Sequence, residues 1–341
     1  MKKKQTTLLE LAKRLNLSPS TVSRALNGRH RISEETRKRV KALADQLEYQ
    51  PNPSAKSLRE SKTYVLGVLV PQIAHEFFSV AISGIEEKAI EAGYSIMICQ
   101  SHESADRERA VAEALLSSRV DGILVSPSQE TKDFGFFRSF LRKDIPVVFF
   151  DRFAPDFPAP RVVVNDYGGA RQAVEHLTRT GCKRIAHVTG PVELSNVRGR
   201  MNGYRDALEA AGYPYDESLI FHCKLIEHGA REAAEELLNL EPRPDAVFCF
   251  NDHLAYDVLQ AAKRRGIRIP EELSLIGFSD EFASALIEPS LTSVTQPAFE
   301  LGRTAASLML EQLQKEEFDM EAEFPAMMLE TSLVLRDSCR S

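Results

Sequence analysis

The chain has 341 residues, of which 43% are hydrophobic and 27% charged, and its formal net charge is −6 at pH 7. This length exceeds one compact domain, and the composition is ordinary for globular protein, so we expect two or three domains with sizeable cores. No apolar run approaches the ~18 residues that cross a bilayer. No N-terminal stretch has the apolar core of a secretory signal. These observations exclude an integral membrane protein and a secreted one.

The charge is unevenly distributed. Residues 1–62 contain 15 Lys and Arg against 6 Asp and Glu, whereas the remainder contains 28 against 43. A basic segment attached to an acidic body predicts that the segment alone meets a polyanion.

The cysteines are odd in number and widely spaced, and they form no CxxC pair: Cys99, Cys182, Cys223, Cys249 and Cys339. This pattern argues against a disulfide framework and against a zinc site. We therefore expect a cytoplasmic protein with no metal and no cofactor.

The N-terminal segment has the pattern of three short helices. Thr7 and Glu10 form a capping box before apolar residues at helical spacing, which predicts a helix over about 7–15. Ser18 can cap a second helix and Pro19 can occupy its first position. A third helix begins after Ser33, with acidic residues at its N-terminus. The turn between the first two is brief, which is typical of a helix-turn-helix whose second helix enters the DNA major groove.

The second helix is amphipathic. Val22, Ala25 and Leu26 form its apolar stripe. Its other face contains Ser20, Thr21, Ser23 and Arg24. Short polar side chains can approach phosphates and base edges closely, and the Arg24 guanidinium matches guanine O6 and N7. The alternative is a solvated helix face that binds nothing. The polar turn over 27–31, with Asn27 and His30, is placed to contact phosphate.

Residues 50–62 are rich in proline and polar side chains. Asn52 can cap a helix and Pro53 can begin it, but the pattern ends after about seven residues, too few for a stable isolated helix. One interpretation is a segment that folds in the minor groove and inserts Leu58 between base pairs, with Lys56 and Arg59 beside it. The other is a linker in which the leucine is incidental.

From Tyr64 onward, apolar runs alternate with helical patterns. Strands are predicted over 65–70, 94–99, 122–126, 147–151, 162–164, 184–189, 246–250, 273–278 and 292–296. Helices are predicted over about 76–92, 105–118, 167–180, 200–211, 229–239, 253–265 and 298–314. Strands that are apolar on both faces and separated by helices form parallel sheets with covered faces. Because these strands are many for one sheet, we expect an α/β body of two doubly wound lobes.

Ligands of such sheets bind beyond the carboxyl ends of the strands. This rule selects residues 71–78, 151–152, 251–252 and 279–280 together with Gln296. Structural alternatives remain open: Asp151 could cap a turn, and Asn251 and Asp252 could cap the helix near His253. For Arg200, a further candidate for the ligand site, the alternative is a pair with a surface carboxylate. No nucleophile elbow, phosphate-binding glycine loop or metal-spaced His/Cys set is present. We therefore predict no catalytic residues.

Eight motifs resemble, in order, those of the lac-repressor-like (LacI/GalR) family of bacterial transcription regulators: TLLELAKRLNLSPSTVSRALNG, PNPSAKSLR, VLGVLVP, HVTGP, RMNGY, CFNDHLA, LIGFSD and SLTSVTQP. The resemblance covers essentially the whole chain. It implies a helix-turn-helix head (1–49), a hinge helix and linker (50–62), and a two-lobed periplasmic-binding-protein-like body for effector binding and dimerisation (63–341). The N-lobe would comprise about 63–163 and 296–322, and the C-lobe about 164–295 and 323–341.

The resemblance also implies roles in DNA binding. The hinge leucine, here Leu58, would insert at the centre of a pseudo-palindromic operator, with Ala55 and Lys56 in the groove. Pro19, Ser20 and Arg24 would contact bases, although Pro19 stands where a larger residue is commoner. The full expected DNA-binding set is Thr7, Ser18, Pro19, Ser20, Thr21, Ser23, Arg24, Asn27, His30, Ala55, Lys56 and Leu58.

For the effector, the matching positions are Ile73, Phe77, Phe78, Asp151, Asn196, Arg200, Asn251, Asp280 and Gln296. A carboxylate, a guanidinium and amides between aromatic walls suit a polyhydroxylated ligand such as a sugar. Ser279 departs from the family, which often has an acidic residue there, so the effector need not be a simple neutral hexose.

The implied function is a transcription regulator, a repressor in preference to an activator, that binds operator DNA as a homodimer with an affinity that a small molecule controls. The sequence does not decide between an inducer and a corepressor. A ligand can change that affinity only by binding the operator-competent and operator-incompetent states differently. Six residues follow Leu335, without a heptad repeat, so we expect a dimer and not a coiled-coil tetramer. The alternatives are a sugar-binding transport receptor, which would need no basic head, and an enzyme that uses groups such as Asp151, His253 and Asp280.

Overall fold

The structure is a computed structural model that describes residues 6–26, 32–47, 49, 62–315 and 324–340. Contacts divide the chain into two units, a head that ends at Tyr64 and a body that begins at Val65. The expected DNA-binding residues Asn27, His30, Ala55, Lys56 and Leu58, and the expected hinge helix, lie outside the described residues.

The head contains the three predicted helices: α1 (Leu8–Leu15), α2 (Pro19–Leu26) and α3 (Glu34–Gln46). The predicted caps are present, since Thr7 Oγ1 accepts from the Glu10 N–H at 3.3 Å and Ser18 Oγ accepts from the Thr21 N–H at 3.1 Å. Asn16 ends α1 in the left-handed region, at φ 56°. A small apolar core holds the helices together, and its fully buried members include Leu11, Val22 and Val40. The predicted helix-turn-helix is confirmed.

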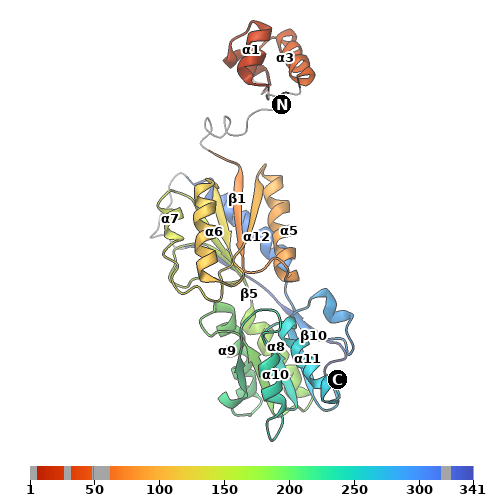
Figure 1. Ribbon diagram of the computed structural model, residues 1–341. Helices are drawn as coiled ribbons and strands as arrows, with labels where there is room; N and C mark the ends of the chain where they lie inside the picture. Colours follow the sequence, from red (N-terminus) through yellow and green to blue (C-terminus); the bar gives the residue numbers. More distant parts are fainter. Residues whose placement is uncertain (1–5, 27–31, 48, 50–61, 316–323, 341) are drawn as a thin grey trace. The chain divides into compact units, whose positions relative to one another are not determined.

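Within the described residues, the body contains two six-stranded sheets (Figure 1). The N-lobe sheet has the order β11-β5-β4-β3-β1-β2 and is parallel throughout. Its strands are β1 (Val65–Val70), β2 (Ser95–Gln100), β3 (Gly122–Val125), β4 (Val147–Phe150), β5 (Arg161–Val164) and β11 (Ala326–Leu329). The two doubly wound lobes and the α/β fold class are thus as predicted.

The C-lobe sheet has the order β12-β10-β9-β8-β6-β7. Its strands are β6 (Ile185–Thr189), β7 (Ile220–His222), β8 (Ala246–Cys249), β9 (Ser274–Ser279), β10 (Thr292–Thr295) and β12 (Ser332–Val334). Only β12 is antiparallel to its neighbour among these described strands.

Helices cover both faces of the N-lobe sheet. Here α5 (Glu76–Glu91) packs against α12 (Ala298–Gln312), while α6 (Ala105–Ser117) covers the opposite face and α7 (Arg138–Leu141) is a single turn. A Cβ on Gly302 would lie 1.9 Å from the Ala81 carbonyl oxygen, so the α5 and α12 backbones approach closely.

The C-lobe has the same construction. Its sheet lies between α8 (Asp166–Arg179) with α9 (Ser195–Ala210) and α10 (Arg231–Leu238) with α11 (Asp252–Arg264). No helix in the described part of the chain is both long enough and apolar enough to cross a membrane.

The described chain crosses between the lobes three times, after β5, after β10 and after β11. Two crossings are tied together, since Asn165 Nδ2 donates to Glu330 Oε2 at 2.9 Å and Thr331 Oγ1 donates to the Asn165 carbonyl at 3.2 Å. Two of the three links between the lobes therefore lie side by side.

Three expectations differ from the structure. Helix α9 begins at Ser195 and not at residue 200, because its first turn is polar and lacks an apolar stripe. The short edge strands β7, β11 and β12 were not predicted, since each has exposed or half-buried side chains. The assignment of residues 323–341 to the C-lobe is wrong for β11, which pairs with β5 in the N-lobe sheet.

Candidate functional site

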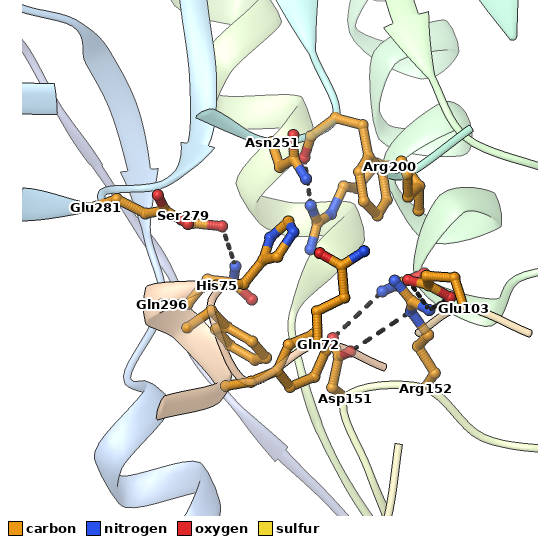
Figure 2. Close-up of a pocket in the computed structure, with 15 residues that line it drawn as sticks. Gln72, His75, Glu103, Asp151, Arg152, Arg200, Asn251, Ser279, Glu281 and Gln296 are labelled. Atoms are coloured by element: carbon orange, nitrogen blue, oxygen red, sulfur yellow. Dashed lines mark hydrogen bonds and ion pairs between the residues drawn. The ribbon is translucent and has the colours of Figure 1, made fainter. Parts of the chain in front are cut away.

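A pocket lies between the lobes, at the carboxyl ends of the strands (Figure 2). It contains about 470 Å³ of empty space, part of it open to solvent. Its lining comes from both lobes and comprises Gln72, His75, Phe77, Phe78, Glu103, Asp151, Arg152, Asn196, Arg200, Leu225, Phe250, Asn251, Ser279, Glu281 and Gln296. The location agrees with the rule for parallel α/β sheets.

Asp151 follows β4 and is held from both lobes. Its Oδ2 accepts from Ser126 Oγ at 3.0 Å, and its Oδ1 accepts from Asn196 Nδ2 at 3.2 Å. The residue is buried, and its backbone occupies the left-handed region at φ 61°. For a residue other than glycine this conformation costs about 1 kcal/mol or more and is typical of functional sites. The pocket therefore contains a carboxylate that is fixed in place.

The charge of Arg152 is balanced by the buried carboxylate of Glu103. Its Nη1 donates to both carboxylate oxygens of Glu103 at 3.0 Å and to the Pro127 carbonyl at 3.1 Å, and both side chains are buried (Figure 2). Glu103 also accepts from the Gln129 N–H at 2.7 Å. The guanidinium therefore positions the loop over 126–131 and is not an unpaired cation.

A second buried carboxylate, Glu108 on α6, holds the same loop. It accepts from the Ser128 N–H and from Thr131 Oγ1, each at 2.6 Å. Burial raises the pKa of Glu108 to about 7, against the lowering effect of these two hydrogen bonds. The loop reaches the other lobe, since Gln129 Oε1 accepts from the Leu225 N–H at 2.8 Å.

Glu108 makes stability depend on pH. The folded state retains its proton to about pH 7, whereas the unfolded chain releases it near 4.5, so this group favours folding as the pH falls through that interval. Lowering the pH from 8 to 5 should therefore add about 3 kcal/mol to the free energy of unfolding through this group. In Glu108→Gln that increment should be missing when urea unfolding is compared at the two pH values.

The matched control is Glu113→Gln, an exposed carboxyl on the same helix, which should retain the increment. Burial also raises the pKa values of Asp166 and Asp252 to about 6. Their contributions to the pH dependence of stability are the same in all three proteins and cancel in the comparison. If the free energy of unfolding changed equally with pH in the wild type and in Glu108→Gln, the increment would not come from Glu108.

Arg200, on α9, is buried, and its guanidinium group lies over two aromatic rings. Its guanidinium carbon lies 4.2 Å from the centroid of the Phe250 ring and 3.6 Å from that of Phe278. Its Nε donates to Asp166 Oδ1 at 2.8 Å, and its Nη1 donates to the Phe250 carbonyl. Burial raises the pKa of Asp166 to about 6 although Arg200 lowers it. Arg200 thus forms one wall of the pocket with its charge already matched.

Gln296 presents an unsatisfied acceptor. Its Nε2 donates to Ser279 Oγ at 3.0 Å, but its Oε1 is buried and has no hydrogen-bond partner among the described residues (Figure 2). A buried carbonyl oxygen without a donor costs free energy, so a ligand hydroxyl that donated to it would be favoured.

Of the expected effector residues, those that line the pocket are Phe77, Phe78, Asp151, Asn196, Arg200, Asn251 and Gln296. Asn251 also makes the alternative contact, since its Oδ1 accepts from the Leu254 N–H and caps α11. Ile73 and Asp280 do not line the pocket. Ile73 is exposed, and its N–H donates to Gln100 Oε1.

Asp280 pairs with Arg336 at 2.6 Å and borders a neighbouring hollow with Phe77 and Phe299. Positive φ angles at Ser279 (129°) and Asp280 (56°) turn the chain after β9, so that Glu281 faces the pocket in place of Asp280.

Sequence reasoning did not single out Glu103, Leu225, Phe250 or Glu281 as ligand-contacting. Glu103 and Leu225 lie in loops remote from any motif, so only the folded chain places them at the pocket. Gln72, His75, Arg152 and Ser279 fall within the stretches that the strand-end rule selects.

In the head, α2 presents its polar residues to the surface. Ser18, Pro19, Ser20 and Arg24 are exposed, as is Thr7 at the start of α1, while Thr21 and Ser23 are half-buried. An exposed guanidinium among small hydroxyl side chains is suited to contact a DNA base edge.

Comparisons with known proteins cover both units. Residues 7–52 match bacterial regulatory proteins of the lacI family, and residues 174–339 match a periplasmic binding protein-like domain. The HTH-type transcriptional regulator DegA of Bacillus subtilis is 34% identical over 299 residues, covering 87% of this chain and 88% of that protein. The HTH-type transcriptional repressor CytR of Escherichia coli (strain K12) is 32% identical over 342 residues, covering 100% and 98%.

Among solved structures, the transcriptional regulator CelR-cellobiose complex has a TM-score of 0.74 and 29% identity, covering 98% of this chain and 100% of that one. The similarity therefore extends over the head and both lobes.

Proposed function

The chain belongs to the lacI family of bacterial regulatory proteins, and from this premise we propose that a small polyhydroxylated molecule in the interlobe pocket controls how tightly the head binds operator DNA. The protein is a DNA-binding transcription regulator with an effector-binding body, and not an enzyme on the same α/β scaffold. Its relatives include the transcriptional repressor CytR, and we propose repression here as well.

One observation supports the class of effector. Both pocket arginines are paired with buried carboxylates, Arg152 with Glu103 and Arg200 with Asp166. An anionic ligand would thus meet no unpaired arginine or lysine in the described lining. The Asp151 carboxylate and the Gln296 Oε1 instead offer acceptors for hydroxyl groups.

Aromatic side chains line the same pocket, since Phe77 and Phe78 stand at one wall with ring centroids 5.2 Å apart and Phe250 lies at another. Apolar rings beside hydrogen-bond acceptors suit a sugar, which has apolar C–H faces and hydroxyl groups around its edge. The cellobiose bound by the solved relative belongs to this class. We therefore propose an uncharged sugar or sugar derivative as the effector.

The effector would act on the lobes. Hydrogen bonds join the lobes around the pocket, from the Phe153 N–H to Ser195 Oγ and from the Leu225 N–H to Gln129 Oε1. A ligand that fits the pocket therefore favours this arrangement of the two lobes. We propose that two copies bind one pseudo-palindromic operator, in the cytoplasm and associated with the nucleoid when bound.

The effector class is tested by thermal unfolding of the purified chain with a panel of ligands. Neutral monosaccharides and disaccharides should include one that raises the unfolding midpoint, because a ligand that binds only the folded state stabilises it. The same ligand should change operator affinity. Stabilisation by sugar phosphates but by none of the matched neutral sugars would contradict an uncharged effector.

Arg24→Ala tests the DNA-binding face. Loss of a bidentate contact to guanine should weaken specific operator binding by about 1–3 kcal/mol, while binding to random duplex falls only as expected for one lost charge. Fluorescence anisotropy with operator and random duplexes measures both. Arg39→Ala, an exposed arginine on α3, is the control and should weaken both duplexes equally. Equal losses for Arg24→Ala would remove Arg24 from base recognition.

A further inference from the structure

A second group of side chains occupies the junction of the lobes. His75 precedes α5 in the N-lobe, His253 lies in the first turn of α11 in the C-lobe, and Glu281 follows β9. One ligand atom from each residue can be chosen such that all three lie within 4.8 Å of one another. The imidazole ring centroids are 4.3 Å apart, and His253 Nε2 is 3.0 Å from Glu281 Oε2.

We propose that His75, His253 and Glu281 bind one divalent transition-metal ion of the Zn²⁺ class, which joins the two lobes. Two imidazoles and one carboxylate with a fourth position open form a known zinc ligand set. The open position would face the pocket, because His75 and Glu281 both line it (Figure 2).

The geometry requires little rearrangement. In tetrahedral zinc sites with bonds of about 2 Å, neighbouring ligand atoms are about 3.3 Å apart. His253 Nε2 and Glu281 Oε2 already meet that spacing, so the His75 ring would move by about 1 to 2 Å.

The donor groups have few other partners. His75 stands at the N-cap of α5 but makes no side-chain capping hydrogen bond. His253 Nε2 is buried and, although close to Glu281, lacks the geometry of a hydrogen bond.

The backbone of Glu281 is fixed by a hydrogen bond. Its side chain is 8% exposed, and its N–H donates to Asp252 Oδ2 at 2.9 Å. Asp252 is itself fixed, because it accepts from Ser284 Oγ and Ser293 Oγ, each at 2.6 Å. Next to the cluster, Glu76 Oε2 accepts from the Phe282 N–H at 2.7 Å and joins the same two lobes.

The consequence for regulation rests on the proposed function. An ion with one ligand in the N-lobe and two in the C-lobe stabilises the arrangement in which the lobes lie this close. Zn²⁺ should therefore change operator affinity in the same direction as any effector that favours that arrangement.

The test uses the full chain, with Co²⁺ as a spectroscopic probe and Zn²⁺ in calorimetry. We expect one equivalent per chain, with d–d absorption of a four- or five-coordinate Co²⁺ site. His253→Gln and Glu281→Gln should each weaken binding by at least about tenfold. His222→Gln is the control, because its side chain is exposed and lies outside the cluster, and it should bind as the wild type does.

Circular dichroism and thermal melts verify that each variant is folded, and His75→Asn supplies a third, smaller change to the cluster. Unchanged binding in folded His253→Gln and Glu281→Gln would overturn the site. Binding of Zn²⁺ with no change in operator affinity would overturn the joining of the lobes. Either result is distinguishable from failure of the proposed function, in which no sugar stabilises the chain or alters operator binding.

Discussion

Arg200→Met should destabilise the body by about 3 kcal/mol at pH 7 and abolish effector binding. Removal of one partner of a buried ion pair leaves the other charge uncompensated, and here Asp166 would lose its Nε donor. The pocket would also lose the planar cation that stacks on Phe250 and Phe278. Urea unfolding and calorimetric titration of the effector measure the two effects.

The destabilisation should grow with pH. Without Arg200, the pKa of Asp166 rises further above its value of about 6, because both the attraction and the hydrogen bond that lower it are gone. The ionised Asp166 carboxylate then lowers the free energy of unfolding more at pH 8.5 than at pH 6. Arg200→Met combined with Asp166→Asn should recover part of the lost stability and flatten the dependence.

The control is Arg198→Ala, an exposed arginine two residues earlier on α9, which should change stability by no more than about 0.5 kcal/mol. If Arg200→Met were as stable as this control at both pH values, the pair with Asp166 would have no structural importance. If it still bound the effector with unchanged affinity, Arg200 would not belong to the site.

Asp151→Ala should raise the effector concentration for half-maximal response by about a hundredfold or more, while operator binding without effector remains intact. Two hydrogen bonds from ligand hydroxyls to a charged carboxylate contribute about 3 kcal/mol together, which corresponds to that factor. The measurement is operator binding by fluorescence anisotropy across an effector titration.

Asp156→Ala removes an exposed carboxylate five residues later and should respond as the wild type does. Because Asp151 also accepts from Ser126 and Asn196, Asp151→Asn provides a variant of the same size that separates loss of charge from loss of packing. An Asp151→Ala protein with an unchanged response would exclude this residue from ligand binding.

Periodicity predicted the central strands of the body well, and the reason is burial. Strands such as β3 and β4 are buried at every position, so their apolar runs are unbroken. The edge strands β7 and β11 have exposed side chains, among them Met327 and Met328. Runs of three or four residues with no alternation give no signal. Their pairing depends on contacts with residues remote in sequence.

The site was predictable where strand ends define it. Asp151, Asn251 and Gln296 follow β4, β8 and β10, so the topology alone brings them together. Glu103 and Glu108 were not predictable, because a carboxylate in a loop or on a helix ordinarily faces water. Their burial results from the loop over 126–131, whose N–H groups need acceptors. The same rule brings residues 71–78 close to 251–252, but it does not indicate that His75 and His253 are in contact.

The three crossings between the lobes also constrain how the protein matures. Strand β11 completes the N-lobe sheet, yet it lies at Ala326–Leu329, after every element of the C-lobe except β12. When the first 164 residues have left the ribosome, the N-lobe therefore still lacks its edge strand β11 and its helix α12. Neither lobe can be completed during translation until residues 326–334 have left the ribosome, so the N-lobe stays incomplete for longer than its position in the chain would suggest.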